Sequence, residues 1–223
     1  MVAGGLGPPD GFGGYRRKLV EALRERGITD LAVLAAVAAT PRHLFVPESV
    51  RHRAYEDSAV PIGGGQTISQ PYVQARYLQA LELTGTERLL EVGTGSGYQT
   101  ALLAQLATHV TSIERLRPLS TAAAAALAAA GLARNVHLIV GDGTTGWHAG
   151  APYDGILVAA GGPQIPAPLV AQLRLGGRML IPVGRADAQR LTLVTRDADG
   201  IHQHELGDAR FVPLIGEHGY PEL

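Results

Sequence analysis

The chain has 223 residues, of which 46% are hydrophobic, and a formal net charge of −1 at pH 7. This length and composition are typical of one globular domain with a sizeable core, and the balanced charge excludes a broad basic surface for nucleic acid. The absence of cysteine excludes disulfides, thiolate nucleophiles and cysteine-bound zinc, and it fits a reducing cytoplasm.

Residues 1–14 are rich in glycine and proline and carry neither a basic segment nor an apolar one, so we expect a flexible tail and not a signal peptide. The alanine-rich stretch at 122–130 is far shorter than the roughly 20 apolar residues that a membrane span needs. We therefore expect a soluble, cytoplasmic protein that binds neither nucleic acid nor membranes.

The first third of the chain is predicted to be helical. Residues 15–26 place apolar side chains on one face of an amphipathic helix, and Asp30 is a candidate N-cap for a second helix at 31–39. A short irregular linker is expected at 41–47, with one helical turn after it at 48–55.

Residues 60–71 are expected to form a loop, since three consecutive glycines are followed by polar residues and a proline. A helix is predicted at 72–83, with Pro71 at or near its first position, where a missing N–H costs nothing. Ser69 or Gln70 then lies at the N-terminus of this helix.

From residue 88 onwards strands and helices alternate. Strands are predicted at 89–92, 109–113, 136–140, 155–159 and 178–183, and helices at 98–106, 116–130 and 166–174. This alternation predicts an α/β fold, with a Rossmann-like, mostly parallel sheet covered on both faces. Two further strands, at 190–195 and 201–206, are separated by a tight Asp-Gly turn and predict an antiparallel C-terminal hairpin.

A glycine-rich turn follows the first of these strands. Gly93, Gly95 and Gly97 stand between an apolar strand and a helix, where backbone N–H groups are free to meet a ligand. A dinucleotide fingerprint would need a third glycine at the position of Tyr98. The spacing instead resembles motif I of S-adenosylmethionine-dependent methyltransferases. Alone, the turn is weak evidence for a cofactor site, because a tight connection between strand and helix that binds no ligand has the same pattern.

Two carboxylates follow the next strands. Glu114 comes about 20 residues after the glycine turn and could accept hydrogen bonds from both ribose hydroxyls of a bound nucleoside. Asp142 lies between two glycines after the strand at 136–140 and could bind an adenine amino group. The alternatives are a solvated strand-end carboxylate for Glu114 and a turn aspartate for Asp142.

Ser69 has two interpretations. It could belong to a functional site, or it could simply cap the following helix, since serine is a favoured N-cap residue. No G-x-S-x-G motif surrounds it, so nothing indicates a Ser-His-Asp triad. His202 and His204 share one face of a strand, but two ligands without a third make a poor metal site, and we expect no metal.

Longer motifs occur in a fixed order along the chain. They are P-R-x-x-F-V-P at 41–47, P-I-G-x-G-Q-T-I-S-Q-P at 61–71, L-E-V-G-T-G-S-G-Y-Q-T at 90–100, G-D-G at 141–143, L-x-x-G-G-R-M-x-I-P-V-G at 173–184 and R-F-V-P-L at 210–214. Together they resemble the protein-L-isoaspartate O-methyltransferase family over nearly the whole chain. The G-Q-T-I-S-Q-P segment discriminates, since other methyltransferases share only the glycine turn and the acidic strand ends.

The resemblance implies a repair enzyme that uses S-adenosylmethionine as its cofactor. It would transfer the methyl group to the α-carboxylate of L-isoaspartyl residues in damaged proteins or peptides, its partners. The methyl ester then collapses through a succinimide, and part of the product returns to the normal aspartyl linkage. The family assigns Ser69 to the active site, and we expect this residue to orient the carboxylate without becoming a covalent nucleophile.

The resemblance also implies which residues contact the cofactor. They are Thr67, Ser69 and Gln70 in the signature loop, Gly93, Gly95, Ser96 and Gly97 at the methionine end, Glu114 at the ribose, and Asp142 with Gly143 on the adenine side. Many members have a threonine where this chain has Ala159. A hydroxyl contact available to those members is therefore missing here.

Other functions stay open on the sequence alone. A methyltransferase for a dedicated peptide or small metabolite would need the same cofactor site, and a non-catalytic nucleoside-binding module would bind the cofactor without turnover. An NAD-dependent dehydrogenase is disfavoured by Tyr98. We expect a single methyltransferase domain over 1–223, with a helical segment and substrate loop at 15–87 and an α/β core at 88–214, that acts as a monomer.

Overall fold

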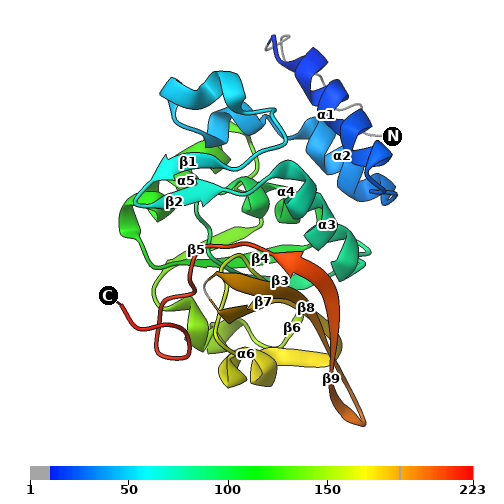
Figure 1. Ribbon diagram of the computed structural model, residues 1–223, viewed down its shortest axis with the longest axis vertical. Coiled ribbons are helices and arrows are strands. Elements are labelled where there is room, and N and C mark those ends of the chain that lie inside the picture. The colour runs from blue at the N-terminus through cyan, green and yellow to red at the C-terminus, as the bar shows by residue number, and fades with distance from the viewer. Residues whose placement is uncertain (1–10, 186, 223) are drawn as a thin grey trace.

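The centre of the protein is a seven-stranded sheet in the order β5-β4-β3-β6-β7-β8-β9 (Figure 1). The computed structural model describes residues 11–185 and 187–222. The strands are β3 (Arg88–Val92), β4 (His109–Glu114), β5 (Val136–Val140), β6 (Tyr153–Val158), β7 (Leu173–Arg185), β8 (Ala188–Asp197) and β9 (Gly200–Ala209). β3 to β7 pair in parallel, and β8 and β9 add antiparallel pairs at one edge. The predicted Rossmann-like sheet with an antiparallel C-terminal hairpin is confirmed.

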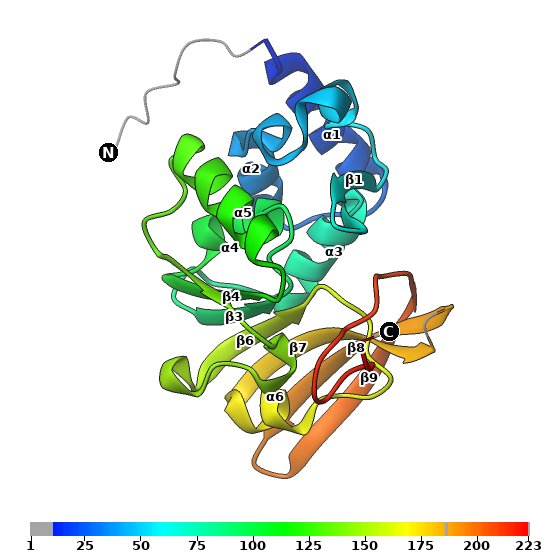
Figure 2. The ribbon, with the colours of Figure 1, turned by 90° about the vertical axis from the view of Figure 1, so that its left-hand side faces the viewer.

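Helices cover both faces of this sheet. They are α1 (Gly13–Glu25), α2 (Leu31–Ala39), α3 (Pro71–Leu81), α4 (Tyr98–Leu106), α5 (Arg117–Ala129) and α6 (Ala167–Gln172). Figure 2 shows α3, α4 and α5 on one face and α6 on the other, with α1 and α2 farther out on the side of α3 and α4. Leu89 and Leu90 are neighbours in β3 and are both buried, one in the core of each face. This two-sided burial explains the apolar runs in the sequence.

The N-terminal third is helical, as predicted, with small differences. Residues 1–10 of the expected tail lie outside the described residues, and α1 begins at Gly13, before the predicted position. The linker expected to be irregular contains a 3₁₀ helix at Arg42–Phe45, and the expected helical turn is a second 3₁₀ helix at Glu48–Arg53. Shorter 3₁₀ helices occur at Gly143–Thr145 and His148–Gly150.

The prediction of a loop before α3 is wrong in one respect, because the segment contains a small hairpin. β1 (Val60–Gly63) and β2 (Gln66–Ile68) pair antiparallel, with Val60 opposite Ile68. The chain reverses at 63–65, where all three glycines have positive φ. Three glycines in a row favour irregular backbone, but here they form the turn between two short strands.

Within the described part of the chain, no helix combines the length and the apolar composition needed to cross a membrane.

The N-cap predicted for α2 is formed by Asp30, and its removal should cost stability. Its Oδ1 accepts hydrogen bonds from the backbone N–H of Ala32 (2.8 Å) and Val33 (3.1 Å). We expect Asp30→Ala to lower the free energy of unfolding by about 1 kcal/mol, because these two donors lose their partner. Urea denaturation measures the change, with Glu21→Ala on the exposed side of α1 as the control. Equal stability of the two variants would contradict the prediction.

Candidate active site

A cleft opens at the carboxyl ends of β3, β4 and β6. The glycine-rich turn after β3 forms one wall, the ends of β4 and β6 a second, and the segment between β2 and α3 a third. Residues 212–215, near the C-terminus, complete the lining. Parallel sheets of this kind bind ligands at such an edge, because the connections after neighbouring strands diverge there.

The glycine-rich turn owes its shape to backbone conformations that other residues adopt rarely. Gly93, Gly95 and Gly97 all have positive φ, at 95°, 53° and 84°. At Gly97, the N-cap of α4, an added Cβ would also lie only 3.0 Å from the Cβ of Ala123 in α5. The turn is therefore held tightly between the sheet and α5, with its backbone exposed to the cleft.

Glu114 ends β4 and braces this turn. Its Oε2 accepts a hydrogen bond from Gly95 N (2.9 Å), and its Oε1 accepts one from Leu116 N (2.9 Å). The side chain is 5% exposed and lines the cleft, so the alternative of a solvated strand-end carboxylate is wrong. Each carboxylate oxygen keeps a further lone pair for a ligand hydroxyl.

Beneath the turn lies a second carboxyl group, Glu91, which sequence reasoning did not single out. It is fully buried in β3, and its Oε2 accepts hydrogen bonds from Thr100 Oγ1 and Ser112 Oγ, both at 2.5 Å. Ser112 Oγ lies 2.6 Å from Thr94 Oγ1 in the glycine turn. Burial, assisted by the nearby charge of Glu114, raises the pKa of Glu91 to about 7 despite the two hydroxyl donors. This network ties β3, β4, α4 and the turn together.

Ser69 lies where the cleft meets a second cavity, since it is in the lining of both. Thr67, Ser69, Ala159 and Val212 line both spaces. The second cavity continues between α3 and the chain after β9, where Arg76 and Arg210 are among its lining residues. A group held in one space can thus approach a group held in the other at Ser69.

The helix-capping interpretation of Ser69 is wrong, because the N-cap of α3 is Gln70 and its side chain caps nothing. The carboxylate of Asp57, which is distant in sequence, caps the helix instead. Asp57 Oδ1 accepts a hydrogen bond from Tyr72 N (2.9 Å), and its Oδ2 accepts one from Gln70 Nε2 (2.9 Å). Gln70 lines the second cavity and not the cleft.

Asp142 behaves largely as the turn aspartate that the sequence left open. Its Oδ1 accepts hydrogen bonds from the backbone N (2.8 Å) and Oγ1 (2.7 Å) of Thr144, and its Oδ2 accepts one from Glu217 N (2.8 Å). Gly143 lines the cleft, whereas Asp142 lies outside its lining. Asp142 thus holds the C-terminal segment next to the cleft, and a contact of its carboxylate with adenine stays a prediction.

Seven predicted residues meet in the cleft: Thr67, Ser69, Gly93, Gly95, Ser96, Glu114 and Gly143. Gln70, Gly97 and Asp142 support its walls. Sequence reasoning gave no role to Gln74, Gln99 and the 212–215 segment, although all of them line the cleft. Gln99 follows Tyr98 in the motif at 90–100. Its place in the first turn of α4, directly after the glycine turn, was the signal that could have indicated it.

Gln99 also shows what kind of group the cleft accepts. Its side chain is 7% exposed, and Nε2 is buried without a hydrogen-bond partner among the described residues. A buried donor without an acceptor is costly, and an oxygen of a ligand would satisfy it. Among the described residues, no group of three or more His, Cys, Asp or Glu side chains is arranged to hold a metal ion.

Comparison with known proteins identifies close relatives. Residues 15–219 match the family described as protein-L-isoaspartate(D-aspartate) O-methyltransferase. The Rhodopseudomonas palustris (strain HaA2) protein-L-isoaspartate O-methyltransferase 1 is 52% identical over 215 residues, which cover 95% of this chain and 87% of that one. The Dictyoglomus thermophilum protein-L-isoaspartate O-methyltransferase is 49% identical over 207 residues, covering 93% and 94% of the two chains.

Solved structures give the same result. A protein-L-isoaspartate O-methyltransferase superposes with a TM-score of 0.84 at 28% identity, covering 92% of this chain and 67% of that one. A Plasmodium falciparum protein described as a putative protein-L-isoaspartate O-methyltransferase, solved in complex with S-adenosyl-L-homocysteine, superposes with a TM-score of 0.80 at 26% identity. That match covers 90% of this chain and 98% of the other.

The buried Glu91 predicts a pH dependence of stability. Because its pKa is about 7 in the folded state and roughly 4 in the unfolded chain, the folded state holds the proton more tightly. Stability is therefore lost as the pH rises from about 4 to about 7. A glutamine side chain at this position cannot ionise but keeps an oxygen for Thr100 and Ser112. We expect Glu91→Gln to gain roughly 3 kcal/mol relative to the wild type between pH 5 and pH 8, measured by urea denaturation. A constant difference across this range would contradict the shifted pKa.

Proposed function

The chain belongs to the protein-L-isoaspartate(D-aspartate) O-methyltransferase family, and we propose that it methylates the α-carboxylate of L-isoaspartyl residues in damaged proteins and peptides. S-adenosylmethionine supplies the methyl group, activated by its sulfonium charge. The observation that carries this proposal is the junction at Ser69, where the cleft after β3 opens into the cavity beside α3. The two spaces have the arrangement that transfer between a nucleoside cofactor and a peptide requires.

The cleft suits S-adenosylmethionine in its donors and acceptors. Glu114 presents a buried carboxylate whose remaining lone pairs match two ribose hydroxyls. Gln99 offers a buried amide N–H without a partner among the described residues, which matches an oxygen at the amino-acid end of the cofactor. Thr67, Ser96 and Gly143 would hold the remaining parts, with Gly93 and Gly95 allowing close backbone approach.

The substrate would place its carboxylate at Ser69. A carboxylate is already ionised near neutral pH, so the reaction needs no strong general base. What the protein must supply is alignment of the carboxylate with the methyl group and exclusion of water, and positioning of this kind can lower a barrier by roughly 7–11 kcal/mol. The Ser69 hydroxyl, which lines both spaces, would donate a hydrogen bond that holds the carboxylate in line.

Ala159 leaves the opposite side of the junction apolar. It follows β6, lines both spaces and faces Gly93, whose added Cβ would lie 3.5 Å from the Ala159 Cβ. No hydroxyl is available here, so Ser69 would carry more of the carboxylate recognition than in relatives with a threonine. Recognition of the carboxylate would therefore depend mainly on the geometry of the Ser69 segment.

We propose that the protein acts as a monomer, in which the proposed reaction needs no residue from a second subunit. The near-neutral charge gives no support to a nucleic-acid partner, and the lack of cysteine fits a reducing cytoplasm. We propose that residues 15–87 and 88–214 work together as one methyltransferase domain, since the Ser69 segment and the glycine turn form opposite walls of the same cleft.

The activity is tested with a pair of peptides that differ only in aspartyl against isoaspartyl linkage. With labelled S-adenosylmethionine, we expect methyl transfer to the isoaspartyl member alone, because only this linkage frees an α-carboxylate at the right distance from the backbone. Equal labelling of both peptides would instead indicate a general carboxyl methyltransferase. Binding of the cofactor without labelling of either would indicate a non-catalytic module.

Ser69→Ala tests the role of the hydroxyl. We expect kcat to fall by about 10- to 100-fold, because a hydrogen bond to a charged group is worth roughly 1.5–3 kcal/mol. The Kd of S-adenosylhomocysteine, measured by calorimetry, and the thermal midpoint should stay near the wild-type values. Ser58→Ala, a nearby serine outside both spaces, is the matched control. A wild-type kcat for Ser69→Ala would refute the assigned role.

A further inference from the structure

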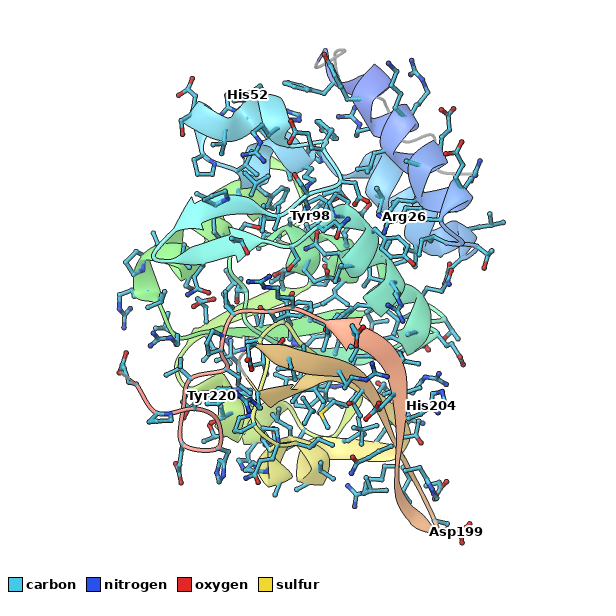
Figure 3. All side chains as sticks on the ribbon, in the orientation of Figure 1. Arg26, His52, Tyr98, Asp199, His204 and Tyr220 are labelled. Atoms are coloured by element: carbon cyan, nitrogen blue, oxygen red, sulfur yellow. The ribbon has the colours of Figure 1, made fainter. Side chains whose placement is uncertain are left out.

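Arg42 is a fully buried arginine whose cation meets no carboxylate within ion-pair distance among the described residues. Its Nε donates to Ala54 O (2.8 Å), one terminal nitrogen donates to Gln74 Oε1 (2.7 Å), and the other donates to Ser69 O (2.7 Å). Its Cζ lies 4.5 Å from the ring centre of Tyr98. Figure 3 shows Tyr98 at the centre of the molecule, between the N-terminal helices and the sheet.

A buried cation lowers the stability of the fold, and packing alone would not require one. Burial lowers the pKa of Arg42 to about 10, so that the side chain stays a cation at neutral pH. A buried charge destabilises a protein unless dipoles and hydrogen bonds replace its water, and an apolar side chain would avoid the problem. The guanidinium is therefore best explained by what its three hydrogen bonds hold in place.

The first group that it holds is the backbone at Ser69. This residue lies between β2 and α3, outside the ladder of the helix, whose first hydrogen bond runs from Gln74 N to Gln70 O. The carbonyl of Ser69 thus depends on Arg42, which comes 27 positions earlier in the chain. Holding the carbonyl fixes the direction in which the Ser69 side chain leaves the backbone.

The second group is the amide of Gln74, in the first turn of α3. Its oxygen accepts from Arg42, and because a guanidinium can only donate, the flipped amide would bring two donors together. The side chain is 6% exposed and lines the cleft. Arg42 therefore sets the orientation of an amide in the cleft wall as well as the position of Ser69.

We propose that Arg42 is a positioning residue for methyl transfer: through one buried guanidinium it holds the backbone at Ser69 and the Gln74 amide in the wall of the adjoining cleft. The proposal rests on the function proposed above. It also accounts for the P-R-x-x-F-V-P motif, which that function left without a role. Misplacement of a reacting group by about 1 Å can cost on the order of 100-fold in rate, so small movements of Ser69 matter.

Lysine is the informative substitution, because it keeps the charge but cannot reach three acceptors in one plane. In the full-length protein we expect Arg42→Lys to lower kcat for the isoaspartyl peptide by about 100-fold. The Kd of S-adenosylhomocysteine should change by less than about threefold, since the three hydrogen bonds of Arg42 go to Ala54, Gln74 and Ser69, and those of Glu114 go to Gly95 and Leu116. Asp30→Ala is the stability control, because it weakens α2 without touching either cavity.

A chemical rescue separates positioning from a general loss of structure. We expect Arg42→Ala to regain part of its kcat in millimolar guanidinium, whose planar donors can occupy the vacated space, and not in equal concentrations of ammonium. Gln74→Met leaves Arg42 and Ser69 in contact and should lower kcat by about tenfold, as loss of one hydrogen bond to a charged group allows. Its thermal midpoint should fall by several degrees, because the buried guanidinium loses one of its three acceptors, so kcat is measured well below that midpoint.

The wild-type enzyme in the same assay separates two kinds of failure. If the wild type does not label the isoaspartyl peptide, the proposed function itself is wrong. If the wild type is active and Arg42→Lys has the same kcat, or loses activity only in proportion to cofactor binding and unfolding, the positioning role is overturned. A Gln74→Met variant with wild-type kcat would overturn the part of the proposal that concerns the amide.

Discussion

The parallel pairing of β3 with β4 and β6 is the constraint on which the rest of the site depends. Val92 lies opposite Ile113 on one side and Val158 on the other. The next residues, Gly93, Glu114 and Ala159, therefore emerge at one level of the sheet. Hydrogen bonds from Gly93 N to Ile113 O and from Ala159 N to Val92 O, both 2.8 Å, extend the pairing one residue beyond β3 and β6. A slip of one residue would move the acidic and glycine positions to the wrong face.

Two buried ionisable groups link the elements around this edge, at a cost in stability. Glu91 links β3, β4 and α4 beneath the glycine turn through three hydroxyl side chains. Arg42 links the 3₁₀ helix at Arg42–Phe45 to α3 and the Ser69 segment. Neither group has a partner of opposite charge within ion-pair distance among the described residues. Both are therefore compensated by hydrogen bonds to neutral groups. Such hydrogen bonds are strong only in a fixed geometry, so these networks hold the walls of the cleft rigidly.

A rigid site fits the chemistry. The nucleophile is ionised without help and the electrophile is activated within the cofactor, so the protein contributes alignment more than proton transfer. The few charged or polar side chains proposed for function reflect this division: Ser69 lines both spaces, Glu114 lines the cleft, and the other residues that line the cleft are uncharged apart from Arg115. Arg76 in α3 and Arg210 after β9 make the second cavity compatible with a carboxylate-bearing peptide, while Asp208 in its lining pairs with Arg190.

The sequence by itself determined the strands, the helices of the core and the glycine turn, because these depend on local periodicity and on backbone conformations that few residues adopt. It also indicated Ser69, Glu114 and Gly143 as lining residues, since strand ends and a distinctive loop are visible in one dimension. Only the tertiary structure decided that Asp57 and not Ser69 caps α3, that Asp142 fastens the C-terminal segment, and that Arg42 reaches Ser69. These contacts join residues 15, 75 and 27 positions apart, and no local pattern encodes a hydrogen bond between segments that meet only when the chain is packed.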